Sequence, residues 1–283
     1  MPDLDPFRPE TFAIEIPAIG IGTWKMGEDP ARFDQEVAAL RHALELGFTH
    51  FDTAEMYGDG GAEEVLGEAI AGADRDSLFI VSKFYPWNAD REAMLASCAA
   101  SLSRLGIEQI DLYLLHWQGD IPFEETLEGA RRLLGEGKIR AFGVSNFDID
   151  AMHDLADRDL LDFVAANQVM HNIPNREAEA ELFPFLAERA IAAIAYSPLE
   201  IGPMAAMEGL EELAESHGLS LAGLAIAWHL TLGLAAPIPK AARQEHLDDL
   251  AGAIEAVPLP PETMHAISEI APVPDPGASL PIR

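Results

Sequence analysis

Four reactive side chains lie at or just past the ends of short apolar segments; they are Asp52, Tyr57, Lys83 and His116. The segments have the composition of buried β-strands and are Phe48–Asp52, Leu78–Lys83 and Ile110–His116. A carboxylate, a phenol, an ammonium and an imidazole are the groups needed to protonate a carbonyl oxygen. In a parallel barrel all strand carboxyl ends open on one face, so we expect these side chains to converge on one site.

Each of these side chains would have a distinct task in carbonyl chemistry. The pKa of a free tyrosine is near 10, and a close ammonium such as Lys83 would lower the pKa of Tyr57. Asp52 would keep Lys83 charged and in place, while His116 would orient the carbonyl and stabilise charge on its oxygen. Taken singly, each residue also has a structural explanation, such as a helix cap or a core histidine. Their combination at strand ends favours a reacting site.

Strand-like segments alternate with helix-like segments along nearly the whole chain. The remaining strand-like segments are Ala18–Gly22, Ile139–Val144, Val164–Val169, Ala190–Tyr196 and Ala235–Ile238. The helix-like segments are Ala31–Leu46, Ala62–Ala71, Arg91–Leu105, Phe123–Gly135, Ile149–Arg158, Arg176–Arg189, Leu221–Leu232 and Glu245–Ala256. Eight strand–helix units predict a single (β/α)8 TIM barrel spanning residues 1–283, with no internal domain boundary.

The two ends of the chain are predicted to lie outside this repeat. Thr11–Pro17 could form a β-hairpin at the barrel bottom, and the proline-rich segment Pro272–Arg283 favours an irregular arm. A doubly wound sheet is the main alternative fold. However, the first strand continues as Gly20–Trp24 rather than as the GxGxxG that a dinucleotide-binding turn requires.

The composition restricts the partners and the compartment. A net charge of −30, from 48 acidic and 18 basic residues, disfavours nucleic acid and anionic membrane surfaces. Such acidity is typical either of adaptation to high salt or of an ordinary acidic soluble protein, and composition leaves both open. The single cysteine, Cys98, and an N-terminus without an apolar signal core favour the cytoplasm.

Two other classes of site find little support. The uncharged stretch Ser216–Pro239 is long enough for a membrane span, but glycines and prolines interrupt it, which favours a buried helix and a short strand. The nine histidines show no metal-ligand spacing and there is no GxSxG motif, so we expect no metal site and no serine nucleophile.

The sequence resembles the aldo-keto reductase superfamily. The similar segments run from about Gly20 to Leu250 and are Gly47–Ala54 with Tyr57–Gly58, Ser101–Gly106, Asp111–Trp117, Gly137–Phe147 and Ile238–Lys240. The resemblance implies NAD(P)H-dependent carbonyl reduction, in which Asp52, Tyr57, Lys83 and His116 form the catalytic tetrad. The resemblance also favours a monomer and does not exclude an oligomer.

The resemblance further implies a set of cofactor-binding residues. Ser145, Asn146 and Gln168 match the positions that hold the nicotinamide carboxamide, and Tyr196 matches the aromatic residue on which the ring stacks. The other matching positions are Gly22, Thr23, Ser197, Leu199, Ile238, Lys240, Arg243 and Asp249.

The segment from Lys240 onward bears on cofactor choice. A lysine with a nearby arginine, here Arg243, suits the 2′-phosphate of NADPH. Downstream the similarity declines, because the usual Glu-Asn pair is replaced by Asp249-Leu250 and Asp248 adds a further negative charge. We therefore expect NADPH, with NADH as the alternative.

The substrate pocket is expected to have aromatic walls and an open mouth. Its candidate residues are Trp24, Met56, Tyr85, Trp87 and Trp117, although each could instead be ordinary packing. Such walls suit aldehydes and compact ketones. Two alternatives remain: a nucleotide-binding regulatory protein on the same barrel, or a sugar or alcohol dehydrogenase that works mainly in the oxidative direction.

Overall fold

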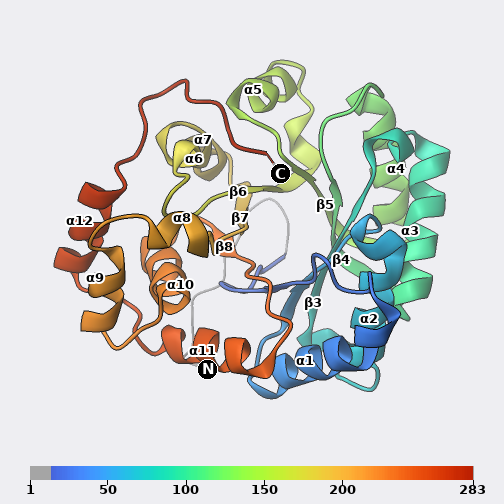
Figure 1. Ribbon diagram of the computed structural model, residues 1–283. Helices are drawn as coiled ribbons and strands as arrows, with labels where there is room; N and C mark the ends of the chain where they lie inside the picture. Colours follow the sequence, from blue (N-terminus) through green and yellow to red (C-terminus); the bar gives the residue numbers. More distant parts are fainter. Residues whose placement is uncertain (1–13, 283) are drawn as a thin grey trace.

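Eight parallel strands form one sheet in which the strand order follows the chain order (Figure 1). The structure is a computed structural model and describes residues 14–282. The strands are β1 (Ile21–Gly22), β2 (His50–Asp52), β3 (Phe79–Phe84), β4 (Ile110–Leu115), β5 (Ile139–Ser145), β6 (Val164–Met170), β7 (Ala192–Tyr196) and β8 (Ala236–Pro237).

The sheet closes on itself between its first and last strands. Gly22 forms a parallel bridge with Lys240, and the Gly22 amide donates to the Pro239 carbonyl oxygen at 2.9 Å. The Gly20 amide donates in the same way to Pro237, also at 2.9 Å. With every neighbouring pair parallel and the ends joined, the chain forms the predicted (β/α)8 barrel, and all strand carboxyl ends open on one face.

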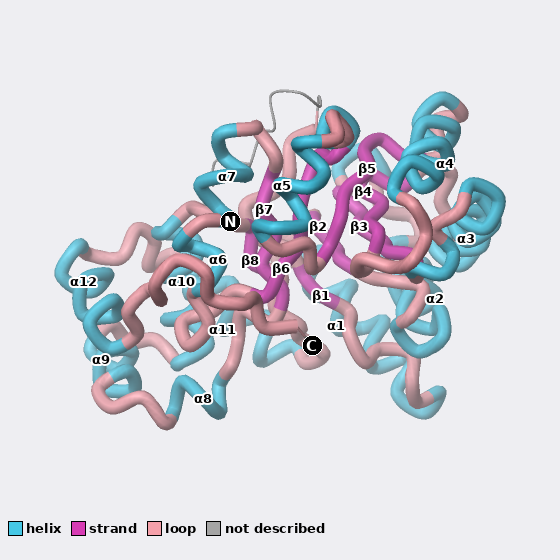
Figure 2. Tube along the Cα trace, turned by 90° about the horizontal axis from the view of Figure 1, so that it is seen from above, coloured by secondary structure: helices cyan, strands magenta, loops and turns pink. Residues whose placement is uncertain are grey.

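Helices surround the strands (Figure 2). They are α1 (Phe33–Glu45), α2 (Gly61–Ile70), α3 (Arg91–Leu105), α4 (Phe123–Gly135), α5 (Ile149–Asp157), α6 (Glu177–Ala180), α7 (Leu182–Glu188), α8 (Ile201–Ala205), α9 (Leu210–Ser216), α10 (Leu221–Leu232), α11 (Gln244–Ile254) and α12 (Pro261–Ile270). Within residues 14–282, none of these helices is long and apolar enough to cross a membrane.

One predicted helix is divided in the structure, and three helices were not predicted. The single helix expected over Arg176–Arg189 is divided into α6 and α7 at Glu181, whose backbone φ of −137° is not helical. Pro184 explains the break, because it has no amide hydrogen to donate to the carbonyl of Ala180, four residues earlier. Helices α8, α9 and α12 were not predicted.

The barrel interior forms one apolar core, and the layer between the strands and the helices forms another. Val81, Leu112 and Ala141 belong to the interior cluster, where Ile14 and Ile16 pack with them. The hairpin predicted over residues 11–17 lies partly outside the described residues. Its described part is buried against this cluster, with exposures of 4% for Ile14 and 0% for Ile16.

The last described segment, residues 272–282, contains no helix or strand, as predicted for an irregular arm. In Figure 1 this arm runs from α12 past α6 and α7. The Gly277 amide donates to the Glu181 carboxylate at 2.7 Å, which ties the arm to the break between those helices.

A buried carboxylate supports strand β3 from behind. Glu63 of α2 is fully buried, and its Oε1 accepts from Ser82 Oγ at 2.6 Å. Its Oε2 accepts from Arg104 of α3 at 2.7 Å. Since Ser82 precedes Lys83, this network fixes the strand that carries one of the four candidate reacting residues.

We predict that Arg104→Met destabilises the fold by about 3 kcal/mol, because it leaves the buried Glu63 carboxylate without its cation. Urea unfolding measures the free energy of unfolding. The double variant Glu63→Gln with Arg104→Met should recover part of the loss, since a neutral amide needs no counter-charge. A double variant that is no more stable than Arg104→Met alone would contradict this account.

Candidate active site

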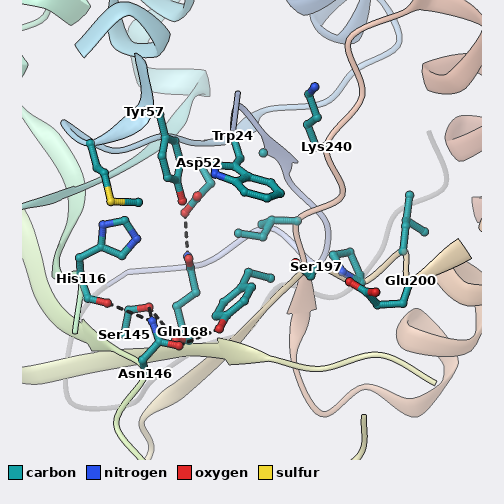
Figure 3. A pocket seen from close by; sticks show the side chains of 16 residues that line it. Trp24, Asp52, Tyr57, His116, Ser145, Asn146, Gln168, Ser197, Glu200 and Lys240 are labelled. Carbon is teal, nitrogen blue, oxygen red and sulfur yellow. Dashed lines mark hydrogen bonds between the residues drawn. The ribbon is translucent and has the colours of Figure 1, made fainter. Parts of the chain in front are cut away.

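Lys83 lies at the centre of three of the predicted reacting groups. Its ammonium donates to Asp52 Oδ1 at 2.5 Å, to the Thr53 carbonyl oxygen at 2.8 Å and to the Tyr57 hydroxyl at 3.3 Å. Asp52 ends β2, Lys83 lies in β3, and Tyr57 begins a short 3₁₀ turn after β2. Adjacent strands thus bring the three side chains together, and Figure 3 shows Asp52 and Tyr57 side by side.

His116 follows β4 and faces the same phenol. The rings of His116 and Tyr57 are 5.8 Å apart and meet edge to face. The His116 amide donates to the Phe84 carbonyl at 3.1 Å, and the Asn146 side chain donates to the His116 carbonyl at 3.1 Å. These two bonds therefore fix the backbone of His116 at the edge of the tetrad, the name we use for Asp52, Tyr57, Lys83 and His116.

The ion pair of the tetrad is fully buried. Burial alone would lower the pKa of Lys83, but the facing Asp52 carboxylate and the Tyr57 hydroxyl together outweigh burial, so that the pKa of Lys83 is raised. The ammonium form is therefore maintained in the barrel interior, where the exposures of Lys83 and Asp52 are 0% and 1%.

The expected lowering of the Tyr57 pKa is corrected by the structure. Burial raises the pKa of Tyr57 and outweighs the opposing effect of the Lys83 ammonium. Local sequence shows the ammonium but not the burial, which explains the error. A phenol with a raised pKa stays protonated at neutral pH, as a proton donor must.

His116 is neutral over the physiological pH range. Burial and the nearby Lys83 ammonium lower its pKa to about 3. A neutral imidazole can donate one hydrogen bond from the nitrogen that carries its proton. It can thus polarise a carbonyl oxygen without adding a second positive charge beside Lys83.

Polar side chains at the ends of β5 and β6 continue the site. Gln168 Nε2 donates to Asp52 Oδ2 at 2.7 Å, and Ser145 Oγ donates to the Gln168 carbonyl at 2.8 Å. Asn146 has a positive φ of 61° and accepts from the Tyr196 hydroxyl at 2.8 Å. These bonds join the tetrad to the end of β7 and fix the predicted aromatic ring of Tyr196. Figure 3 shows Ser145, Asn146 and Gln168 close together.

One cavity of about 400 Å³ collects most of the predicted residues. Its lining comprises Gly22, Trp24, Asp52, Met56, Tyr57, His116, Ser145, Asn146, Gln168, Tyr196, Ser197, Pro198, Leu199, Glu200, Ile238 and Lys240. Pro198 and Glu200 were not predicted. Pro198 lies between the predicted residues Ser197 and Leu199, and Glu200 follows Leu199, so their positions in the sequence could have indicated that they line the cavity. Figure 3 shows Lys240 pointing away from the tetrad.

Several predicted residues lie outside the lining of this cavity. Thr23 is buried behind it and donates to the Asp52 carbonyl at 3.1 Å. Arg243 lines a separate cavity of about 270 Å³ beside α1. Asp249 accepts from Ser220 at 2.6 Å and does not line the cavity, so the structure does not bring it to the site.

Three aromatic residues form a group next to His116 rather than lining this cavity. Tyr85 and Trp87 stack with ring centres 4.2 Å apart, and Trp117 meets both edge to face. Glu55, which was not predicted, accepts from the Tyr85 amide at 2.7 Å and from Asn88 at 3.0 Å. Its position in the sequence gave no sign of this role, because both partners come from the next strand unit.

The family model described as "Aldo/keto reductase family" matches residues 18–272. The chain belongs to this family. It is 43% identical over 249 residues to methylglyoxal reductase YeaE of Escherichia coli (strain K12), covering 86% of this chain and 87% of that protein. A Klebsiella pneumoniae aldo-keto reductase solved in complex with NADPH superposes with a TM-score of 0.92 at 39% identity, covering 99% of this chain and 100% of that one.

A third relative differs in cofactor. The NADH-specific methylglyoxal reductase of Escherichia coli (strain K12) is 32% identical over 219 residues, covering 68% of this chain and 66% of that protein. The family assignment confirms the predicted superfamily, the barrel and an activity of nicotinamide-dependent carbonyl reduction. The regulatory alternative is not favoured.

We predict that acid destabilises this aldo-keto reductase because buried His50 and His116 resist protonation. Burial lowers the pKa of His50 to about 4 and that of His116 to about 3, both from 6.5. Below pH 6.5 the unfolded chain therefore binds more protons than the folded chain. Stability should fall as pH decreases, by up to about 1.4 kcal/mol per pH unit for each histidine.

Urea unfolding between about pH 7 and pH 5 measures this slope. Burial also lowers the pKa of His171 and His229, which add to the same slope. His116→Gln removes one of these four groups, so its stability should decline less steeply than that of the wild type. Equal slopes for His116→Gln and wild type would contradict the assignment of acid sensitivity to His116.

Proposed function

We propose that this chain reduces aldehydes and ketones with NADPH and that Tyr57 is the general acid. The observation that carries the proposal is the contact of the Tyr57 hydroxyl with the buried Lys83–Asp52 pair, on the wall of a cavity that also contains His116. A bound nicotinamide cofactor supplies the hydride. The chain must then position the carbonyl and deliver one proton to its oxygen.

The residues of the cavity suit such a cofactor. Ser145, Asn146 and Gln168 present hydroxyl and amide groups of the kind that pair with a carboxamide, and Tyr196 offers a flat face beside them. Because Asn146 accepts from the Tyr196 hydroxyl, amide recognition and ring stacking are held in one arrangement. These contacts would hold the nicotinamide at the end of the cavity that contains the tetrad.

The proton step follows from the charges around Tyr57. Its raised pKa keeps the phenol protonated before reaction. Once the proton leaves, the phenolate lies beside the Lys83 ammonium, which stabilises it. His116, being neutral, would donate to the same carbonyl oxygen and fix the face that is presented for reduction.

Lys240 supports NADPH as the preferred cofactor. It is half-buried, and its pKa is lowered by burial and by the nearby Arg32 and Lys25, against the opposing effect of Glu36 and Glu28. A lysine that lines the cavity with another cation nearby suits an anion such as a phosphate. The NADPH complex of the Klebsiella pneumoniae relative supports this choice, while the NADH-specific relative makes NADH the alternative.

A small aldehyde or dicarbonyl is the proposed substrate class. The cavity of about 400 Å³ must hold part of the cofactor as well, which leaves room for a compact substrate beside Met56 and Trp24. The similarity to a methylglyoxal reductase of Escherichia coli and to a glyoxal reductase of Bacillus subtilis supports dicarbonyls. A single domain over residues 1–283, a monomeric state and a cytoplasmic location stay predictions, and adaptation to high salt stays one of the two explanations of the acidic composition.

We predict that Tyr57→Phe lowers kcat for carbonyl reduction by about 100-fold or more, because the general acid is removed. NADPH affinity should change by less than about threefold, since the phenol hydroxyl acts on the carbonyl. Reduction of methylglyoxal and cofactor fluorescence measure the two quantities. Tyr113→Phe, the same change at a buried tyrosine outside the cavity, is the control. A Tyr57→Phe enzyme with wild-type kcat would refute the assignment.

We predict that Lys240→Ala lowers kcat/KM for NADPH by about 10- to 100-fold, because it removes a charge-assisted bond to phosphate. The value for NADH should change by less than about threefold. Lys138→Ala, which removes an exposed lysine, should leave both values unchanged. An unchanged NADPH to NADH ratio in Lys240→Ala would show that this lysine does not select the cofactor.

A further inference from the structure

The wall of the cavity after β7 depends on one residue in an unusual conformation. Ser197 has a φ of 49°, in the left-handed region that residues other than glycine seldom adopt. It is followed by Pro198, Leu199 and Glu200, and all four line the cavity. The turn at Ser197 therefore decides where this stretch of wall runs (Figure 3).

Asn172 holds Ser197 from behind the cavity. Its side-chain amide is fully buried, and Nδ2 donates to the Ser197 carbonyl oxygen at 2.9 Å. Residues in strained backbone regions persist only where the surroundings fix them. The bond from Asn172 to the carbonyl of the strained residue supplies such a restraint.

The orientation of the Asn172 amide is fixed by a turn. Its Oδ1 accepts from the Asn175 amide at 2.9 Å and from Asn175 Nδ2 at 2.7 Å. Because both bonds require an acceptor at that end, the Nδ2 end must face Ser197. The turn itself is anchored, since Arg176 pairs with Glu179 and donates to the Ala271 carbonyl at 2.6 Å.

Asn172 also lies next to the strand that carries the predicted stacking ring. Met170 at the end of β6 pairs with Tyr196 at the end of β7. The amide of His171 then approaches the Tyr196 carbonyl at 3.4 Å. The contact between Asn172 and Ser197 thus extends the β6–β7 pairing past the ends of both strands.

We propose that Asn172 is a positioning residue for cofactor binding. It holds Ser197 in the left-handed conformation and so directs residues 197–200 along the cofactor cavity. The proposal rests on the proposed NADPH site. It assigns no chemical role to Asn172, because the tetrad comes from β2, β3 and β4 and the bonds of Asn172 go to Ser197 and Asn175.

Asn172→Asp tests the donor alone. The carboxylate has the same shape and still accepts from Asn175, but it cannot donate to the Ser197 carbonyl. We expect the Kd for NADPH to rise about tenfold, with kcat at saturating NADPH changed by less than about twofold. Gln109→Glu makes the same amide-to-carboxylate change at a side chain that donates to the Gly137 carbonyl and does not line the cavity, so it should leave the Kd within about twofold of wild type. A wild-type Kd in Asn172→Asp would overturn the proposal.

A second substitution separates positioning from general stability. Glycine adopts a positive φ without strain, so in a Ser197→Gly background the Asn172→Asp change should raise the Kd by less than about threefold. An undiminished tenfold effect in that background would overturn the proposal. Should Asn172→Asp not fold, Asn172→Ser carries the same comparison.

The outcomes also distinguish this proposal from the proposed function. A wild-type protein that binds no NADPH would refute the proposed function itself. A wild type that binds NADPH and an Asn172→Asp variant that binds equally well would refute only the positioning role.

Discussion

The buried pair of Lys83 and Asp52 is the interaction on which the site depends. A charged ammonium in a barrel interior is stable only because a carboxylate faces it at 2.5 Å, and the carboxylate itself also accepts from Gln168. Each partner comes from a different strand, so the pair exists only when the barrel register is correct. Tyr57 and His116 then acquire their protonation states from this charge and from their own burial.

Hydrogen bonds connect this pair with the predicted cofactor-binding residues in an unbroken series. Gln168 bonds to Asp52, Ser145 bonds to Gln168, and Asn146 donates to Ser145 and accepts from the Tyr196 hydroxyl. The tetrad and the predicted cofactor-binding residues therefore share one framework of strand ends.

Much of this arrangement could be predicted from the sequence, because its signals are local. Helix α3 matches its predicted bounds, since Asp90 caps its first turn and Gly106 ends it in a left-handed conformation. The tetrad was predictable from residue type and strand position. The raised pKa of Tyr57, the contacts of Glu55 and the bond from Asn172 depend on distant burial or on partners in other strand units. Short α8, with Gly202 and Pro203 inside it, carried no helical signal.

The seam where the barrel closes has a consequence for dynamics. β1 and β8 are the shortest strands, each of two residues, and few ladder bonds join them. Amide protons at such a place exchange with solvent through small local openings rather than through unfolding of the whole domain. Because Gly22 and Lys240 meet at the seam and also line the cavity, a local opening of the seam would loosen the side of the cavity that these two residues form.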